Sequence, residues 1–456
     1  AVPYYKEVLV INHKIYGTVS LEVVYAMANL GKAQADLTHH DQAIELYKMA
    51  LDILERTGNR GHPAGNAIIN NMVVSCAAQG DPQPAIQFYT RMLPMMQQRF
   101  GENHPDVALK LNNLASILLD CGRFQDAIGY LEKALAVNQS LYGDEHPEVA
   151  RNLNNLGGAW GNLGQPKKAI DYLLKSLAIW KAVYGEIHPH VAAALNNGGL
   201  MFAELDEYEH AIDLYQNALA IYRQYYGEAH DLVAYTLNNI GEAYRALKQP
   251  EQAIDYYRRA MAIDCELFGR EHPNVARSLN NIGLAWEALG DHGQAIDFLQ
   301  QALEVDRGHY GTNHPALGID LFNLAEVWKG MGEYEKAINS GRQALGIYQG
   351  LDLDTHPDVP KIMNQLAGCY YALGDYKQTI EYFELAVTVA ITIYGEEHEE
   401  VARLLGNLAW ALFETGEKQE ARDCFEQAYQ MFCKLYGPQH PQTQDLAEWV
   451  RRCKEF

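Results

Sequence analysis

Histidine recurs along the chain at one fixed spacing, and an imidazole can bind a metal, move a proton or cap a helix. Ten histidines are separated by 42 residues each, and eight of them precede proline: His62, His104, His146, His188, His230, His272, His314, His356, His398 and His440. Equivalent residues of successive repeats lie roughly 10 Å apart, whereas a histidine–zinc bond is about 2 Å. These histidines therefore cannot share an ion. Their place at helix starts predicts capping, with no metal and no other cofactor.

The sequence contains no motif that would hold phosphates, zinc or a nucleophilic serine. G-x-x-x-x-G-K-[ST], H-E-x-x-H and G-x-S-x-G are absent, as is G-x-G-x-x-G after a strand. The repeat also runs without insertions, so it lacks the long loops that usually carry active sites. We therefore predict a binding protein rather than an enzyme. A buried polar cluster that breaks the repeat would instead indicate an unrecognised catalytic site.

Asparagine is the second residue type with a regular position, at the eighth and ninth places after each histidine. The pairs are Asn70-Asn71, Asn112-Asn113, Asn154-Asn155, Asn196-Asn197, Asn238-Asn239 and Asn280-Asn281, and Asn323 continues the ninth place. At about 100° per residue, the ninth place points roughly 150–180° away from the apolar stripe of its helix. Since an amide both donates and accepts, a row of them can bind the backbone of an extended peptide. Alternatively, these amides bond to the neighbouring helix.

Basic and aromatic residues lie at less regular places on the same predicted face. Arg151, Arg277 and Arg245 could pair with a carboxylate of a ligand, and Trp410 and Tyr235 could add aromatic contacts. The alternative is that these are scattered, solvated charges. The candidate ligand-binding residues are Asn71, Asn113, Asn155, Asn197, Asn239, Asn281, Asn323, Arg151, Arg277, Arg245 and Trp410.

Composition narrows the class of partner. Acidic residues outnumber basic ones 58 to 36, and the net charge of -22 repels nucleic acid and anionic membrane surfaces. No stretch approaches the roughly 18 apolar residues of a membrane helix. The seven cysteines are scattered, which is typical of reduced core residues in an intracellular protein. We expect a cytoplasmic protein that binds a protein or peptide segment, with no nucleic acid or membrane as partner.

Two helices per unit must position these residues. The first helix carries an apolar stripe three, seven, ten and fourteen places after the histidine, as in Val149, Leu153, Leu156 and Trp160. The second helix ends at an aromatic residue followed by glycine, and proline then begins the next helix. The pattern predicts an all-α solenoid of about twenty-two antiparallel helices, with the first helices on its concave side.

The segment Gly143-Asp-Glu-His-Pro-Glu-Val-Ala-Arg-Asn-Leu-Asn-Asn-Leu-Gly157 resembles tetratricopeptide repeats of the 42-residue kinesin-light-chain type. The resemblance extends over nearly the whole chain. It implies a right-handed superhelix of helix pairs, with a concave groove that holds peptide backbone. Similar arrays are fused to signalling ATPases and caspase-like proteases in microbes.

We interpret residues 1–17 as the second helix of a repeat that begins upstream, 18–439 as ten 42-residue repeats, and 440–456 as a C-terminal capping helix. The predicted function is a peptide- or protein-binding scaffold, the sensor or targeting part of a larger protein whose effector domain lies upstream. A cargo adaptor of kinesin-light-chain type is the alternative, and a heptad segment upstream would favour it.

Overall fold

The computed structural model describes residues 1–37, 39–58, 63–79 and 81–453, and within these ranges the chain forms helices and turns but no strand. His62 and the last three residues of the predicted capping helix lie outside the described residues. The helices are α1 (Val2–Tyr16), α2 (Leu21–Ala35), α3 (His40–Arg56), α4 (Pro63–Gln79), α5 (Gln83–Phe100), α6 (Pro105–Asp120), α7 (Phe124–Tyr142), α8 (Pro147–Asn162), α9 (Pro166–Tyr184), α10 (Pro189–Ala203), α11 (Tyr208–Tyr226), α12 (Asp231–Ala246), α13 (Pro250–Phe268), α14 (Pro273–Ala288), α15 (His292–Tyr310), α16 (Pro315–Gly330), α17 (Tyr334–Gly350), α18 (Asp358–Ala372), α19 (Tyr376–Tyr394), α20 (Glu399–Thr415), α21 (Lys418–Tyr436) and α22 (Pro441–Arg452).

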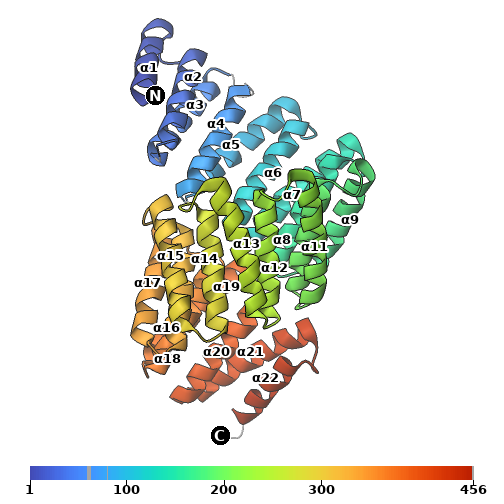
Figure 1. The fold of residues 1–456 in the computed structure, drawn as a ribbon, viewed down its shortest axis with the longest axis vertical. Helices are drawn as coiled ribbons and strands as arrows, with labels where there is room; N and C mark the ends of the chain where they lie inside the picture. The colour runs from blue at the N-terminus through green and yellow to red at the C-terminus, as the bar shows by residue number, and fades with distance from the viewer. Residues whose placement is uncertain (38, 59–62, 80, 454–456) are drawn as a thin grey trace.

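Each helix packs against the next one along the chain, which confirms the predicted α-solenoid of helix pairs (Figure 1). The even-numbered helices are the first helices of the repeats and the odd-numbered ones are the second. Consecutive first helices from α6 to α18 also contact one another, whereas no contact of comparable extent joins consecutive second helices in the described ranges. The first helices therefore line the inner side of the superhelix, as predicted.

The repeated histidines begin the first helices. In eight repeats the imidazole Nδ1 accepts the backbone N–H two residues ahead, at 3.1–3.3 Å: His104, His146, His188, His230, His272, His314, His356 and His398. The aromatic ring that ends the preceding helix stacks on the imidazole, for example Tyr226 on His230 with ring centroids 3.9 Å apart. Capping is thus confirmed at seven of these positions; α18 begins one residue later, so His356 bonds to the N–H of its first residue from outside the cap, and His440 makes no side-chain cap bond.

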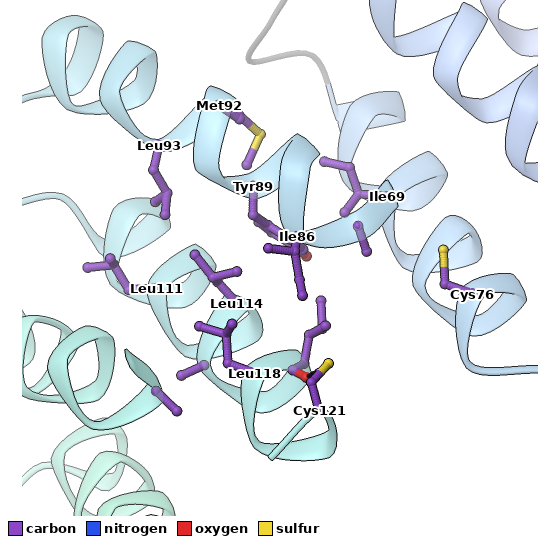
Figure 2. Close-up of a cluster of buried hydrophobic side chains, with 14 of the residues drawn as sticks. Ile69, Cys76, Ile86, Tyr89, Met92, Leu93, Leu111, Leu114, Leu118 and Cys121 are labelled. Carbon is purple, nitrogen blue, oxygen red and sulfur yellow. Dashed lines mark hydrogen bonds between the residues drawn. The ribbon is translucent and has the colours of Figure 1, made fainter. Parts of the chain in front are cut away.

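Small residues let the two helices of a repeat approach closely. A Cβ added to Gly157 would lie 2.6 Å from Cγ of Leu173, and one added to Gly241 would lie 2.6 Å from Cε1 of Tyr257. Larger apolar side chains fill the space between repeats, as Figure 2 shows for Tyr89, Leu111 and Leu114 of α5 and α6. No helix of the described ranges is both long enough and apolar enough to cross a membrane.

Candidate functional site

The ninth-place asparagines join neighbouring first helices on the inner side. In five repeats their Nδ2 donates to Oδ1 of the eighth-place asparagine of the preceding repeat, at 2.8–3.4 Å: Asn197 to Asn154, Asn239 to Asn196, Asn281 to Asn238, Asn323 to Asn280 and Asn407 to Asn364. We call these residues the asparagine ladder. Where Gln365 replaces asparagine, its Nε2 donates to the backbone carbonyl of Phe322 at 3.0 Å. The amides therefore hold successive repeats together.

The ladder leaves part of each ninth-place amide available. These side chains are half-buried, and each donates one N–H to the preceding first helix. A primary amide has two N–H groups and a carbonyl oxygen, so a second N–H and the carbonyl remain for another partner. Of the other predicted ninth-place residues, Asn113 donates to the Tyr89 hydroxyl at 3.4 Å, and Asn71 and Asn155 are half-buried on α4 and α8. Ligand contact at these residues stays a prediction.

The eighth-place asparagines bond to the neighbouring first helix, which was the alternative left open by the sequence. Asn112, Asn238 and Asn280 are buried, and each bonds to a polar residue six places after the next histidine. Asn152 donates to Asn112 at 2.9 Å, and Asn280 donates to Asp320 at 3.0 Å. The only signal in the sequence was a polar residue, such as Asn152 or Asp320, at a place that otherwise lies in the buried part of the helix.

Two of the three predicted arginines already have acidic partners on their own helix. Arg151 pairs with Glu148, and Arg245 pairs with Glu242, whose carboxylate also accepts the Tyr257 hydroxyl at 2.9 Å. These intrahelical pairs neutralise the charge that was expected to attract a ligand carboxylate.

Arg277 differs from the other two. Its guanidinium lies over the ring of Tyr235 on the preceding first helix, 5.2 Å from the centroid. Its Nε, like that of Arg151, is buried without a hydrogen-bond partner, but unlike Arg151 and Arg245 it forms no ion pair within the described ranges. Burial raises the pKa of the buried Asp264, and the charge of Arg277 acts to lower it. The structure thus brings together two candidates that lie one repeat apart, and leaves a cationic donor unsatisfied beside an aromatic ring.

Trp410 lies far from this pair along the chain, on α20. Its ring contacts that of Tyr371, with centroids 4.4 Å apart and planes tilted by 50°. With Arg403, Asn407 and Trp449 it lines a pocket of about 290 Å³ between α20 and α22. The pocket forms where Gly406 occupies the eighth place, so the side chain that fills this space in other repeats is missing.

Two buried carboxyl groups, Asp306 on α15 and Asp320 on α16, break the apolar character of the packing. They are 6% and 3% exposed, and one oxygen of each has no hydrogen-bond partner. Burial raises the pKa of Asp306 to about 7; burial, together with the nearby Asp306, raises that of Asp320 to about 8. Among the described residues, no group of three or more histidine, cysteine or acidic side chains has the arrangement to hold a metal ion.

Comparisons with known proteins agree with this architecture. The tetratricopeptide repeat family profile matches residues 106–182, 160–224, 190–266, 265–308, 275–350 and 358–434, which together span more than half of the chain. None of the curated proteins compared with the chain matches it significantly.

Several solved structures resemble the chain. A putative kinesin light chain of Podosopora anserina with nearly identical TPR-like repeats is 22% identical, with 45% of this chain and 97% of that chain covered and a TM-score of 0.39. BtubC (BKLC) from P. vanneervenii is 24% identical, with 50% and 92% covered and a TM-score of 0.43. A Rap protein complexed with Competence and Sporulation Factor is 15% identical, with 77% and 98% covered and a TM-score of 0.48. On the evidence of the family match and the stacked helix pairs, the chain belongs to the tetratricopeptide repeat family.

Proposed function

We propose that the protein is a non-catalytic scaffold whose inner, first-helix face binds a segment of a partner protein, with Arg277 receiving a carboxylate of that segment. The observation that carries this proposal is that the Arg277 guanidinium lies over Tyr235 with its buried Nε unpaired and, unlike Arg151 and Arg245, forms no ion pair in the described ranges. Buried donors are normally paired, and an orphaned one indicates a missing acceptor. A carboxylate fits a guanidinium because its two oxygens can accept two parallel N–H bonds.

The asparagine ladder supports an extended backbone as the second element of recognition. Asn239 and Asn281 lie on the same two first helices as Tyr235 and Arg277, α12 and α14. Their remaining N–H and carbonyl groups can bond a peptide backbone without reading its side chains. Residues of an extended peptide repeat at about 3.3 Å, so about three of them correspond to the roughly 10 Å between packed helices.

Net charge and the free cysteines support the proposed class of partner and the proposed compartment. The net charge of -22 favours protein partners over nucleic acid or anionic membranes. All seven cysteines are free thiols, which suits a reducing compartment such as the cytoplasm. An upstream effector domain and a role as a cargo adaptor stay predictions.

The test begins with a displayed library of random dodecapeptides selected on the full chain. Selected peptides are then measured by fluorescence anisotropy against the parent, Arg277→Ala and Arg259→Ala. Arg259 is a matched control, because it also lies over a tyrosine ring, Tyr256, at 5.1 Å, but on the second helix α13. A hydrogen bond to a charged group contributes about 1.5–3 kcal/mol, so Arg277→Ala should weaken binding roughly ten- to hundredfold. Arg259→Ala should bind like the parent.

Selection that enriches no peptide would contradict the scaffold function. Equal affinities for all three proteins would instead place the binding surface elsewhere than at Arg277. Amidation of a selected peptide's carboxylate should reduce its affinity for the parent but not for Arg277→Ala.

A further inference from the structure

Two turns of the superhelix touch each other, and turn glycines mark the contact. A Cβ added to Gly122 would lie 2.3 Å from Cδ of Pro357, and one added to Gly164 would lie 2.4 Å from Nε2 of His398. In each case the partner lies one turn of the superhelix further along the chain. The glycines at the same place in later repeats have no such neighbour within 4 Å: Gly290, Gly332, Gly374 and Gly416. Contact between turns is therefore confined to a few repeats.

Burial at equivalent places of the repeat shows the same contact. Ile393 is the second residue before the glycine that ends its helix, and it is 9% exposed. The aliphatic residues at that place in other repeats are 38–65% exposed: Ile15, Leu141, Val183, Leu267 and Leu435. Ile393 shares one apolar cluster with Cys121 and Phe124, from the other turn. It is buried because that turn covers it.

On the other turn, too, residues at the contact are more buried than residues at equivalent places in other repeats. Cys121 and Leu163 directly precede the turn glycines that touch the other turn, and they are 5% and 6% exposed. The apolar residues before the uncovered glycines Gly290, Gly332 and Gly374 are 38–44% exposed: Leu289, Met331 and Leu373. We call the contact the seam; it consists of Cys121, Gly122, Phe124, Leu163 and Gly164 on one turn, and Pro357, Ile393 and His398 on the next.

The seam is less well packed than the repeats it joins. A cavity of about 270 Å³ remains between the turns, lined by Cys76, Ile117 and Cys121 on one side and by Leu353 and His356 on the other. Figure 2 shows Cys76 on α4 and Cys121 at the end of α6, on the first of these turns. Side chains that line an unfilled cavity lack van der Waals partners on one side, which destabilises the packing there. In contrast, the two helices of a repeat interlock through the full lengths of both.

A hydrogen bond crosses the seam at His398. His398 uses Nδ1 to cap its own helix, accepting the Glu400 N–H at 3.1 Å. The rest of the ring lies against Gly164 and hydrogen-bonds to the backbone of Leu163. This bond, the apolar patch and an electrostatic interaction of Glu204 with Lys361 all join different repeats, so separation of the turns leaves every intra-repeat contact in place.

From this difference in packing we propose that the seam is a latch: it opens while the repeats remain folded and converts the closed superhelix into a more extended one. Repeats in a solenoid are stabilised mainly by their nearest neighbours, so they do not need the seam in order to fold. Contacts that are few and loosely packed open at lower free energy than the core. Opening moves two turns apart and so widens the lateral access to the inner face.

The native cysteines report on the latch directly. Burial raises the pKa of the Cys121 thiol to about 12 and that of Cys369 to about 11, so both react slowly while they are covered. Cys121 lies in the seam, whereas Cys369 is 0% exposed inside a repeat of α18 and α19. Alkylation of the full chain by iodoacetamide, mapped by mass spectrometry of its peptides, gives both rates in one sample. A latch predicts that Cys121 reacts at least tenfold faster than Cys369.

Two substitutions with matched controls test the cause. Ile393→Asp places a charge in the seam, and Leu267→Asp makes the same change at an equivalent place that is 39% exposed. Ile393→Asp should accelerate alkylation of Cys121 at least tenfold, leave Cys369 unchanged and increase the radius of gyration measured by small-angle X-ray scattering. Leu267→Asp should match the parent in all three measurements.

Gly122→Ala is the milder variant, with Gly374→Ala as its control. Both glycines have positive φ, 73° and 77°, so the backbone cost is shared and only the contact with Pro357 differs. Gly122→Ala should expose Cys121 more than Gly374→Ala does. The proposal is overturned if Cys121 and Cys369 become reactive together, since the seam would then open only by unfolding. It is also overturned if neither seam variant accelerates Cys121.

Discussion

The buried carboxyl of Asp320 should make the protein less stable as the pH rises, and Asp320→Asn should remove much of that dependence. Asn280 donates to Oδ1 of Asp320 at 3.0 Å, and the other oxygen, Oδ2, is buried without a partner. Asparagine keeps an oxygen acceptor for Asn280 and cannot ionise. The change therefore removes the charge while it preserves the size of the side chain and its bond to the neighbouring repeat.

The sign follows from the two protonation states. Burial raises the pKa of Asp320 to about 8 in the folded protein, whereas an unfolded aspartate has a pKa of about 3.9. Between these values folding takes up a proton, so stability is highest below about pH 4 for this group and falls until about pH 8. One pKa unit corresponds to about 1.4 kcal/mol, which gives an upper limit of roughly 6 kcal/mol for the full shift. Asp306, whose pKa burial raises to about 7, acts in the same direction.

The assay is urea unfolding followed by circular dichroism at pH 5 and pH 8. The parent should show a lower midpoint at pH 8, and the difference should shrink in Asp320→Asn because the group with the large upward shift no longer ionises. Asp297→Asn is the control, since Asp297 is exposed on α15. Equal pH dependence in the parent and in Asp320→Asn would refute the reasoning, because it would mean that the Asp320 carboxylate is solvated or compensated in the folded protein.

Two further stability predictions follow from the repeat itself. His146→Ala should lower the free energy of unfolding by about 1–2 kcal/mol, because it removes the helix cap to Glu148 at 3.2 Å and the ring stacked on Tyr142 at 4.3 Å. Thermal melting of this variant is compared with that of His210→Ala, a change on the exposed surface. Equal melting temperatures would argue against a stabilising cap. Asn239→Ala should cost about 0.5–1.5 kcal/mol by removing the bond to Asn196, whereas Asn217→Ala on the exposed face of α11 should not destabilise. If both asparagine variants unfold at the same urea concentration, the ladder does not stabilise the solenoid.

The fold could be predicted from sequence because its determinants are local. Each capping histidine, turn glycine and apolar stripe acts within one 42-residue unit, and the unit recurs without insertion. The outward direction of the ninth place follows from helical geometry alone, and Asn239 and Asn281 lie there as expected.

The features that the sequence did not predict depend on contacts between repeats. Arg151 and Arg277 occupy the same place in their repeats; Arg151 pairs with Glu148 three residues earlier, whereas Arg277, with Asn274 at that place, lies over Tyr235 of the neighbouring repeat, and only the structure shows this contact. The seam is harder still to predict. Ile393 and Leu267 are both aliphatic residues at one place of the repeat, and what separates them is the superhelical pitch, which sums many small rotations between helices.

Where one repeat meets the next, an aromatic ring stacks on the capping histidine, and this joint affects how such an array can gain or lose repeats. Tyr142 and His146 lie four residues apart, so the whole joint is encoded within one short stretch of gene. An in-frame duplication of one repeat length reproduces a complete joint wherever its ends fall. The seam adds a condition, because a unit gained or lost between Gly122 and Pro357 would place a different helix start against each turn glycine. Recombination outside that interval lengthens the solenoid freely, whereas recombination within it also changes which turns meet.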